Sequence, residues 1–76
     1  MKEILESILK NLVQNTDAIS INEVQKDKLT VFEVKVAPED MGKVIGKEGK
    51  IAKAIRNILR AIGAKEQKKV TVEFID

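Results

Sequence analysis

The first half of the chain has the polarity pattern of a helix followed by two strands. Between residues 2 and 14, apolar side chains recur every three or four positions, which predicts an amphipathic helix. Those apolar positions are Ile4, Leu5, Ile8, Leu9, Leu12 and Val13. Residues 15–17 are turn formers and end the helix. Residues 18–25 and 29–36 are rich in β-branched side chains and are separated by three polar residues, so they are predicted to form a β-hairpin.

Two helices and a last strand are predicted after the hairpin. Pro38 suits the first position of a short helix, and the two acids after it favour the positive end of the helix dipole. Residues 46–49 break this helix. Beyond them, an apolar stripe predicts a second helix with basic residues on the opposite side. The stripe is Ile51, Ile55, Ile58, Leu59 and Ile62, and the basic residues are Lys53, Arg56 and Arg60. We expect Gly63 to cap this helix, and residues 70–75 alternate in polarity as a strand.

The order of elements is therefore α-β-β-α-α-β, without a repeat or a linker. Joining the second and third strands through two helices requires a crossover, which predicts a parallel pair in an otherwise antiparallel sheet. The fold class is α+β, a three-stranded mixed sheet with three helices packed on one face. At 76 residues the chain is expected to be a single domain (residues 1–76), near the lower size limit for a self-sufficient core, and a stable partner would suit it.

The composition argues against catalysis and against a resident cofactor. The chain has no cysteine and no histidine, which excludes disulfides, thiol nucleophiles, thiolate metal sites and the commonest general base. Glu39 and Asp40 are adjacent at a predicted helix start, with no nucleophile near them in sequence. Charged residues interrupt the apolar positions of residues 1–13, so we predict no signal peptide, no membrane span and a cytoplasmic location.

The small net charge of +2 conceals a concentration of positive charge in one segment. Residues 43–60 carry six basic side chains and one acidic one, so the rest of the chain is acidic on balance. A basic helix alone is most simply a solvated face, but this one adjoins a glycine turn. The combination is typical of a surface that binds a polyanion.

That turn is Gly46-Lys47-Glu48-Gly49, and it lies between two apolar runs. Glycines adopt backbone angles barred to other residues and let a ligand's backbone approach closely. The helix behind the turn directs its free N–H groups and the positive end of its dipole to the same place. The spacing fits neither a Walker A loop nor a Rossmann fingerprint. A tight helix-to-helix turn with no ligand is the remaining structural alternative.

The V-I-G-x-x-G core formed by residues 44–49, with the element order of the whole chain, resembles the type II KH domain family. The resemblance implies binding of about four single-stranded RNA nucleotides, with the backbone N–H groups of residues 46–49 on the sugar-phosphate backbone. The counter-charge and the apolar groove for the bases would come from several side chains. The expected RNA-binding residues are Gly46, Lys47, Glu48, Gly49, Lys50, Lys53, Lys43, Arg56, Val44, Ile45 and Ile51. Val34 or Val36 is a further groove candidate, and so is Ile55, although Ile55 is favoured more as a core residue.

The aromatic content favours this family over other RNA-binding folds. Phe32 and Phe74 are the only aromatic residues, whereas RRM and OB-type binders stack bases on several. A KH groove holds bases by aliphatic packing, which suits this chain. Glu48 places an acid in the loop and is expected to weaken the grip on phosphate without removing it.

Small stand-alone bacterial KH proteins, which the whole chain resembles, imply a wider role and a partner. They imply an RNA chaperone or post-transcriptional regulator that affects cell-wall synthesis, cell division and cell length. They also imply homodimers and heterodimers with a larger, multi-domain KH protein of the Jag type. The alternative is a protein-interaction module with little RNA affinity of its own, in which the apolar stripe from Ile51 to Ile62 serves as a dimer seam.

Overall fold

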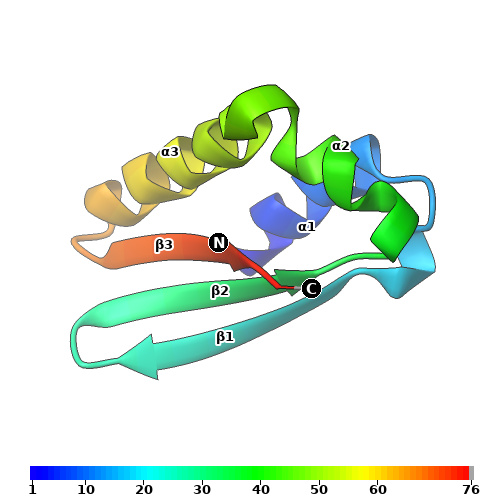
Figure 1. The fold of residues 1–76 in the computed structure, drawn as a ribbon. Helices are drawn as coiled ribbons and strands as arrows, with labels where there is room; N and C mark the ends of the chain where they lie inside the picture. The colour runs from blue at the N-terminus through cyan, green and yellow to red at the C-terminus, as the bar shows by residue number, and fades with distance from the viewer. Residues whose placement is uncertain (76) are drawn as a thin grey trace.

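The computed structural model describes residues 1–75 and has the predicted order of helices and strands. The elements are α1 (Lys2–Leu12), a 3₁₀ turn (Thr16–Ala18), β1 (Ser20–Lys26), β2 (Leu29–Lys35), a 3₁₀ turn (Pro38–Asp40), α2 (Met41–Ile45), a 3₁₀ turn (Lys47–Gly49), α3 (Lys50–Lys65) and β3 (Lys69–Phe74). The α-helices lie together over one face of the sheet, with α3 running above β3 (Figure 1). The α+β fold class is confirmed.

The sheet is mixed, as the crossover requires. Its strand order is β1-β2-β3. β1 and β2 pair antiparallel with Ile21 opposite Val34, while β2 and β3 pair parallel with Phe32 opposite Val72. Residues on β2 and β3 that are two apart point to the helices and build the core with α1 and α3. The core residues are Leu5, Leu9, Val13, Phe32, Val34, Val36, Val44, Ile55, Leu59, Val70 and Val72.

The central position of β2 corrects one sequence expectation. Val34 and Val36 were expected as groove candidates at the edge of the second strand, but β2 has a neighbour on each side and both valines are buried. The free edge beside α3 belongs to β3 instead. Strand neighbours across a crossover depend on the whole fold, so the local pattern could not identify this edge.

Gly63 lies inside α3 and does not cap it, because the helix continues to Lys65. A Cβ at Gly63 would lie 2.7 Å from Cγ2 of Val70 and 2.9 Å from the carbonyl oxygen of Lys68. The glycine therefore allows α3 and β3 to approach closely. Its own carbonyl accepts a 2.8 Å hydrogen bond from the Lys68 amide, which closes the turn into β3.

Asp40 anchors the start of α2 to the end of α1. Its side chain is wholly buried, and its carboxylate accepts hydrogen bonds from the amides of Gln14 (3.1 Å) and Asn15 (2.9 Å). Lys43 lies 3.3 Å from the same carboxylate. The Asn15 amide is the main cause that lowers the pKa of Asp40 below its ordinary 3.8, with the Gln14 amide and Lys43 acting in the same direction against burial. The sequence predicted only that Asp40 would stabilise the helix dipole. It did not predict that Asp40 would connect α2 to the end of α1.

Candidate nucleic-acid interface

The glycine turn joins α2 to α3 and depends on left-handed backbone angles. Gly46 has φ 75° and ψ 173°, and Gly49 has φ 74° and ψ 15°. Glu48 also lies in the left-handed region at φ 58°. The two glycines differ in what surrounds them: a Cβ at Gly46 would lie 2.6 Å from Cγ1 of Ile51, whereas a Cβ at Gly49 would meet nothing within 4 Å. Gly46 is thus required by packing, and Gly49 leaves open space beside the loop.

Two of the four loop amides donate hydrogen bonds to main-chain carbonyls of the protein. The Gly46 N–H donates to the Gly42 carbonyl (2.9 Å), and the Gly49 N–H donates to the Gly46 carbonyl (3.1 Å). The expected approach of all four N–H groups to a sugar-phosphate backbone stays a prediction, but these two amides already have main-chain partners in the protein. Within residues 1–75, no backbone hydrogen bond of the turn uses the amides of Lys47 or Glu48. These two N–H groups remain to contact an anion.

The basic side chains near the turn are exposed. Lys47, Lys50 and Lys53 extend into solvent from the turn and the first turns of α3. Lys43 is exposed too, but its ammonium contacts Asp40 and lies 3.4 Å from Oε1 of Gln14, which directs it toward the end of α1. The positive end of the sixteen-residue α3 coincides with the three exposed lysines, so this corner of the molecule favours anions.

The structure divides the predicted groove residues into core and surface. Val44 and Ile55 are buried in the core, so neither side chain is exposed to a base in this structure. Ile45 and Ile51 are half-buried and pack against the edge of the core. Ile58, which belongs to the predicted apolar stripe, is 44% exposed on α3.

Arg56 lies on a different side of α3 from the one that its place in the basic stripe predicts. It is half-buried, and its Nε donates a 2.9 Å hydrogen bond to the main-chain oxygen of Val72. Its guanidinium carbon is 5.9 Å from the centre of the Phe74 ring. Arg56 therefore joins α3 to β3 beside the free edge of the sheet. Phe74 takes part in this contact between α3 and β3 as well. The alternating polarity of the last strand did not predict that its side chain would contact Arg56.

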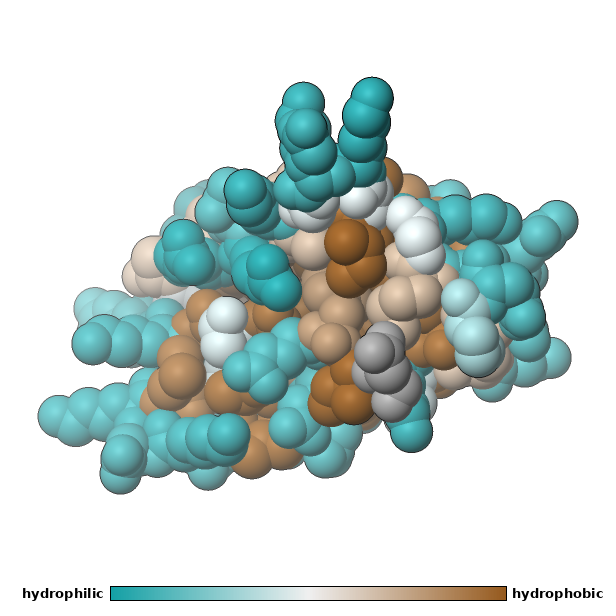
Figure 2. All heavy atoms as spheres, in the orientation of Figure 1, coloured by the Kyte–Doolittle hydropathy of each residue, from teal (hydrophilic) through white to brown (hydrophobic). Residues whose placement is uncertain are grey.

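Figure 2 shows this side of the molecule. Long hydrophilic side chains stand above the junction of α2 and α3, and apolar atoms gather below them, toward the end of β3 (Figure 2). The half-buried apolar residues of the bordering elements are Met41, Ile45, Ile51 and Phe74. An apolar strip below a cationic corner suits a strand of nucleotides, with phosphates above and bases below.

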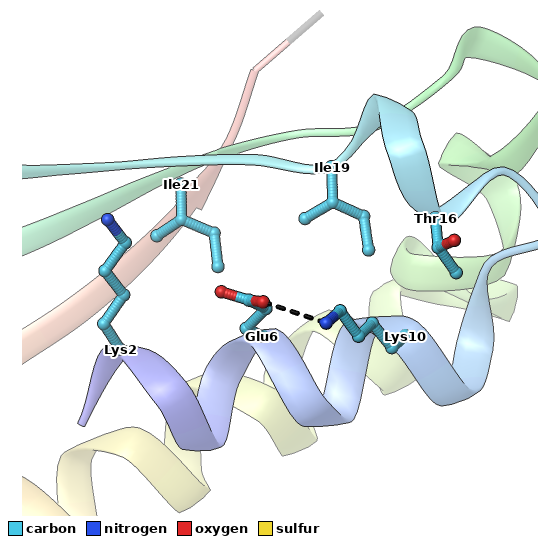
Figure 3. A pocket seen from close by; sticks show the side chains of 6 residues that line it. All are labelled: Lys2, Glu6, Lys10, Thr16, Ile19 and Ile21. Atoms are coloured by element: carbon cyan, nitrogen blue, oxygen red, sulfur yellow. Dashed lines mark ion pairs between the residues drawn. The ribbon is translucent and has the colours of Figure 1, made fainter.

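A hollow of about 220 Å³ between α1 and β1 has a different character. Ile19 and Ile21 line it from one side, and Lys2, Glu6 and Lys10 line it from the helix (Figure 3). Glu6 and Lys10 form an ion pair of 3.0 Å, drawn as a dashed line in Figure 3. Because opposite charges alternate along this helix face, the hollow offers an anion much less than the glycine turn does.

Comparison with protein families decides what kind of domain this is. The family model described as KhpA/KhpB, KH domain matches residues 2–74. The chain belongs to the KhpA/KhpB family of KH domains. Relatives named RNA-binding protein KhpA are 53% identical to it over 99% of the chain in Clostridium acetobutylicum and Clostridium perfringens, and each is covered completely. The KhpA of Aquifex aeolicus is 45% identical over the whole chain, with 96% of that relative covered.

A solved structure has a similar fold. The crystal structure of a variant of Aquifex aeolicus Era bound to GDP and AlF4⁻ matches 95% of this chain with a TM-score of 0.53 and 22% identity, and the chain spans 28% of that protein. At this identity the likeness concerns the fold alone. The type II KH interpretation of the sequence is confirmed by the KhpA/KhpB family match and by the fold.

Two searches of the described residues had negative results. Among residues 1–75, no helix combines the length and the apolarity that crossing a membrane demands. The same residues contain no cluster of three or more acidic side chains placed to hold a metal ion.

Proposed function

We propose that this protein binds single-stranded RNA through the turn of residues 46–49 and the start of α3. The KhpA/KhpB family is a family of RNA-binding KH domains and not of enzymes. The observation that carries the proposal is the open, left-handed Gly49 at the start of α3, beside the unpaired amides of Lys47 and Glu48. A ligand backbone can come close to this point, where the helix dipole favours negative charge.

Each part of the site has a separate task in this proposal. The amides of Lys47 and Glu48 contact phosphate oxygens, and Lys47, Lys50 and Lys53 supply counter-charge, with Lys43 at the margin. The bases lie on the apolar strip at Ile45 and Ile51. Phosphate contacts carry no sequence information, and aliphatic packing discriminates weakly, so base preference is modest.

The biological role follows from the family resemblance. We propose an RNA chaperone or post-transcriptional regulator in the cytoplasm, linked to cell-wall synthesis, cell division and cell length. Its partners would be single-stranded RNA, a second copy of the chain, and a larger, multi-domain KH protein of the Jag type. The match to a family model that covers both KhpA and KhpB supports the last of these.

Fluorescence anisotropy of labelled single-stranded RNA tests the site. The variant Lys47→Asp/Glu48→Asp places two acids in the turn, and Lys2→Asp makes the same change of net charge on α1. Circular dichroism checks that both variants fold. We expect the double variant to lose binding and Lys2→Asp to bind like the wild type. Equal binding by all three would place the RNA elsewhere.

A second candidate function is a dimerisation module, and one observation favours it. Ala54, Ile58 and Ala61 are exposed at spacings of four and three residues on α3, on the side away from the core. Two such stripes could pack against each other from two copies of the chain. Sedimentation of the wild type and of Ile58→Arg tests this: a dimer that Ile58→Arg dissociates supports it, and a wild-type monomer at high concentration refutes it.

A further inference from the structure

The face of the sheet that points away from the helices has no covering layer in residues 1–75 (Figure 1). Phe32 and Val72 are opposite each other and face the helices, so the residues next to them on each strand face the other way. Val31 lies at the centre of this open face, between Val24 on β1 and Thr71 on β3. It is only 2% exposed, so the centre of the open face is closely packed and mostly apolar.

An acidic row of residues lies on one side of this centre. Glu33 and Glu73 are directly opposite each other on β2 and β3, and like charges in such positions repel. Asn22 continues the row on β1, and its Nδ2 donates a 3.3 Å hydrogen bond to Oε1 of Glu33. The ion pairs within residues 1–75 include neither glutamate. The described part of the chain therefore leaves both carboxylates without a cation.

A basic row lies at the same distance on the other side of the centre. Lys26 and Lys69 are the register neighbours of Leu29, and both lysines are exposed. Leu29 and Glu33 are each two residues from Val31 along β2, which is roughly 7 Å at the rise of a strand. Neither lysine belongs to an ion pair formed between residues 1–75. The open face is thus acidic at one end, apolar in the middle and basic at the other end.

A second copy of the chain has the complementary arrangement of charges. A two-fold rotation about an axis that crosses the strands at Val31 places the acidic row of each copy on the basic row of the other. Glu73 then faces Lys69 of the second copy, and the two apolar centres meet. This rotation keeps the strands of the two sheets nearly aligned, as stacked sheets about 10 Å apart require. A rotation about the strand direction would instead place like charges against each other.

We infer that two copies of this protein associate through the open faces of their sheets. The surface is different from the exposed stripe of α3, which lies on the helical side, and its use needs no RNA. It is small, because three strands about 4.8 Å apart and six or seven residues long give a flat footprint of roughly 300 Å². A standard interface covers about 800 Å² of each partner, so the association is weak and depends on protein concentration.

The stacked arrangement leaves the proposed RNA site of each copy free. The turn of residues 46–49 belongs to the helical layer, which is the outer layer of the stacked pair (Figure 1). A pair therefore presents two turns to one RNA. Binding of the second turn becomes intramolecular once the first has bound, which raises the affinity for RNAs long enough to reach both.

Sedimentation of charge-reversed variants at low salt, without RNA, tests the inference. Glu33→Lys/Glu73→Lys makes both rows basic, and Lys26→Glu/Lys69→Glu makes both rows acidic. Protein concentrations up to about 1 mM detect a Kd of that order. We expect the wild type to associate, each variant alone to stay monomeric, and an equimolar mixture of the two variants to associate again. Added salt should dissociate the wild type and the mixture, because it screens exposed charges. Circular dichroism checks that both variants fold.

A matched control separates this contact from general attraction between oppositely charged proteins. Glu3→Lys/Glu39→Lys has the same net charge as the basic variant, but its changes lie outside the open face. It should not associate with the acidic variant, and association as strong as that of the first mixture would overturn the inference.

Two further results would overturn it. One is a wild type that stays monomeric up to the highest concentration. The other is a wild-type dimer that Ile58→Arg dissociates and that both charge-reversed variants retain, which would identify the α3 stripe as the contact. Loss of RNA binding in Lys47→Asp/Glu48→Asp would leave the proposed RNA-binding function intact in either case.

Discussion

The Nε atom of Arg56 donates a hydrogen bond of 2.9 Å to the main-chain oxygen of Val72, and this bond fastens the middle of α3 to the outer edge of the sheet. The guanidinium lies over the Phe74 ring, so two residues of β3 depend on a single side chain. A basic residue that looks like a phosphate ligand in the sequence is thus part of the wall of the site.

Arg56→Ala should lower both stability and RNA affinity, whereas Lys50→Ala should lower affinity alone. The first change removes a charge-assisted hydrogen bond, which contributes about 1.5 kcal/mol at the low end of its range. Lys50 is exposed at the start of α3 and has little to lose in packing. Urea unfolding and anisotropy measure the two effects. Identical unfolding midpoints for Arg56→Ala and the wild type would show that the Val72 bond contributes nothing to the fold.

The two glycines of the turn should respond differently to alanine. Gly46→Ala meets Ile51 at 2.6 Å and a backbone conformation suited to glycine, so we expect loss of the folded α2–α3 junction. Gly49→Ala meets open space and should cost only the left-handed strain, about 1–2 kcal/mol. Thermal unfolding by circular dichroism ranks the two. If Gly49→Ala were the more damaging, the packing account of Gly46 would be wrong.

Gly42→Ala should stabilise the protein. Gly42 lies within α2 at a negative φ, and a Cβ there would meet nothing within 4 Å. Alanine is favoured over glycine in a helix interior by about 0.5–1 kcal/mol. A rise in the thermal midpoint checks this expectation. A fall in the midpoint would show that helix propensity does not determine the effect of residue 42 on stability.

Asp40 should make stability depend on pH in the acid range. Its pKa is lower in the folded chain than the ordinary 3.8, so its carboxylate stabilises the fold above that pH. This contribution is lost as the pH falls below 3.8 and through the lower, folded pKa. Asp40→Asn should be less stable at pH 7, because an amide cannot accept from both Gln14 and Asn15 while facing Lys43. Unfolding curves of the two proteins, measured between pH 7 and pH 2.5, should converge at the acid end.

Local patterns predicted the elements well, because helices and strands follow from the spacing of apolar residues. The V-I-G-x-x-G core also located the turn correctly, since only glycine adopts φ near 75° without strain. The sequence failed where the answer depended on neighbours across the crossover. The identity of the free sheet edge and the place of Arg56 both depend on how β3 pairs with β2.

Asp40 illustrates the same limit over a longer range. Its partners lie 25 and 26 residues away in sequence, so no local window contains them. A carboxylate near a helix start is already explained by its favourable interaction with the helix dipole. The sequence therefore gave no reason to expect that Asp40 also joins α1 to α2.

The parallel pairing of β2 and β3 also has a kinetic consequence. The hairpin of β1 and β2 closes over a short loop, whereas β3 must find β2 across the whole of α2 and α3. Contacts between distant residues form slowly because closing a long loop costs more entropy. The contact between α3 and β3, which the Arg56 bond fastens, is therefore expected to form late in folding and to open early in unfolding. A ligand that binds only the folded chain, as RNA is proposed to do, stabilises the folded state against this opening.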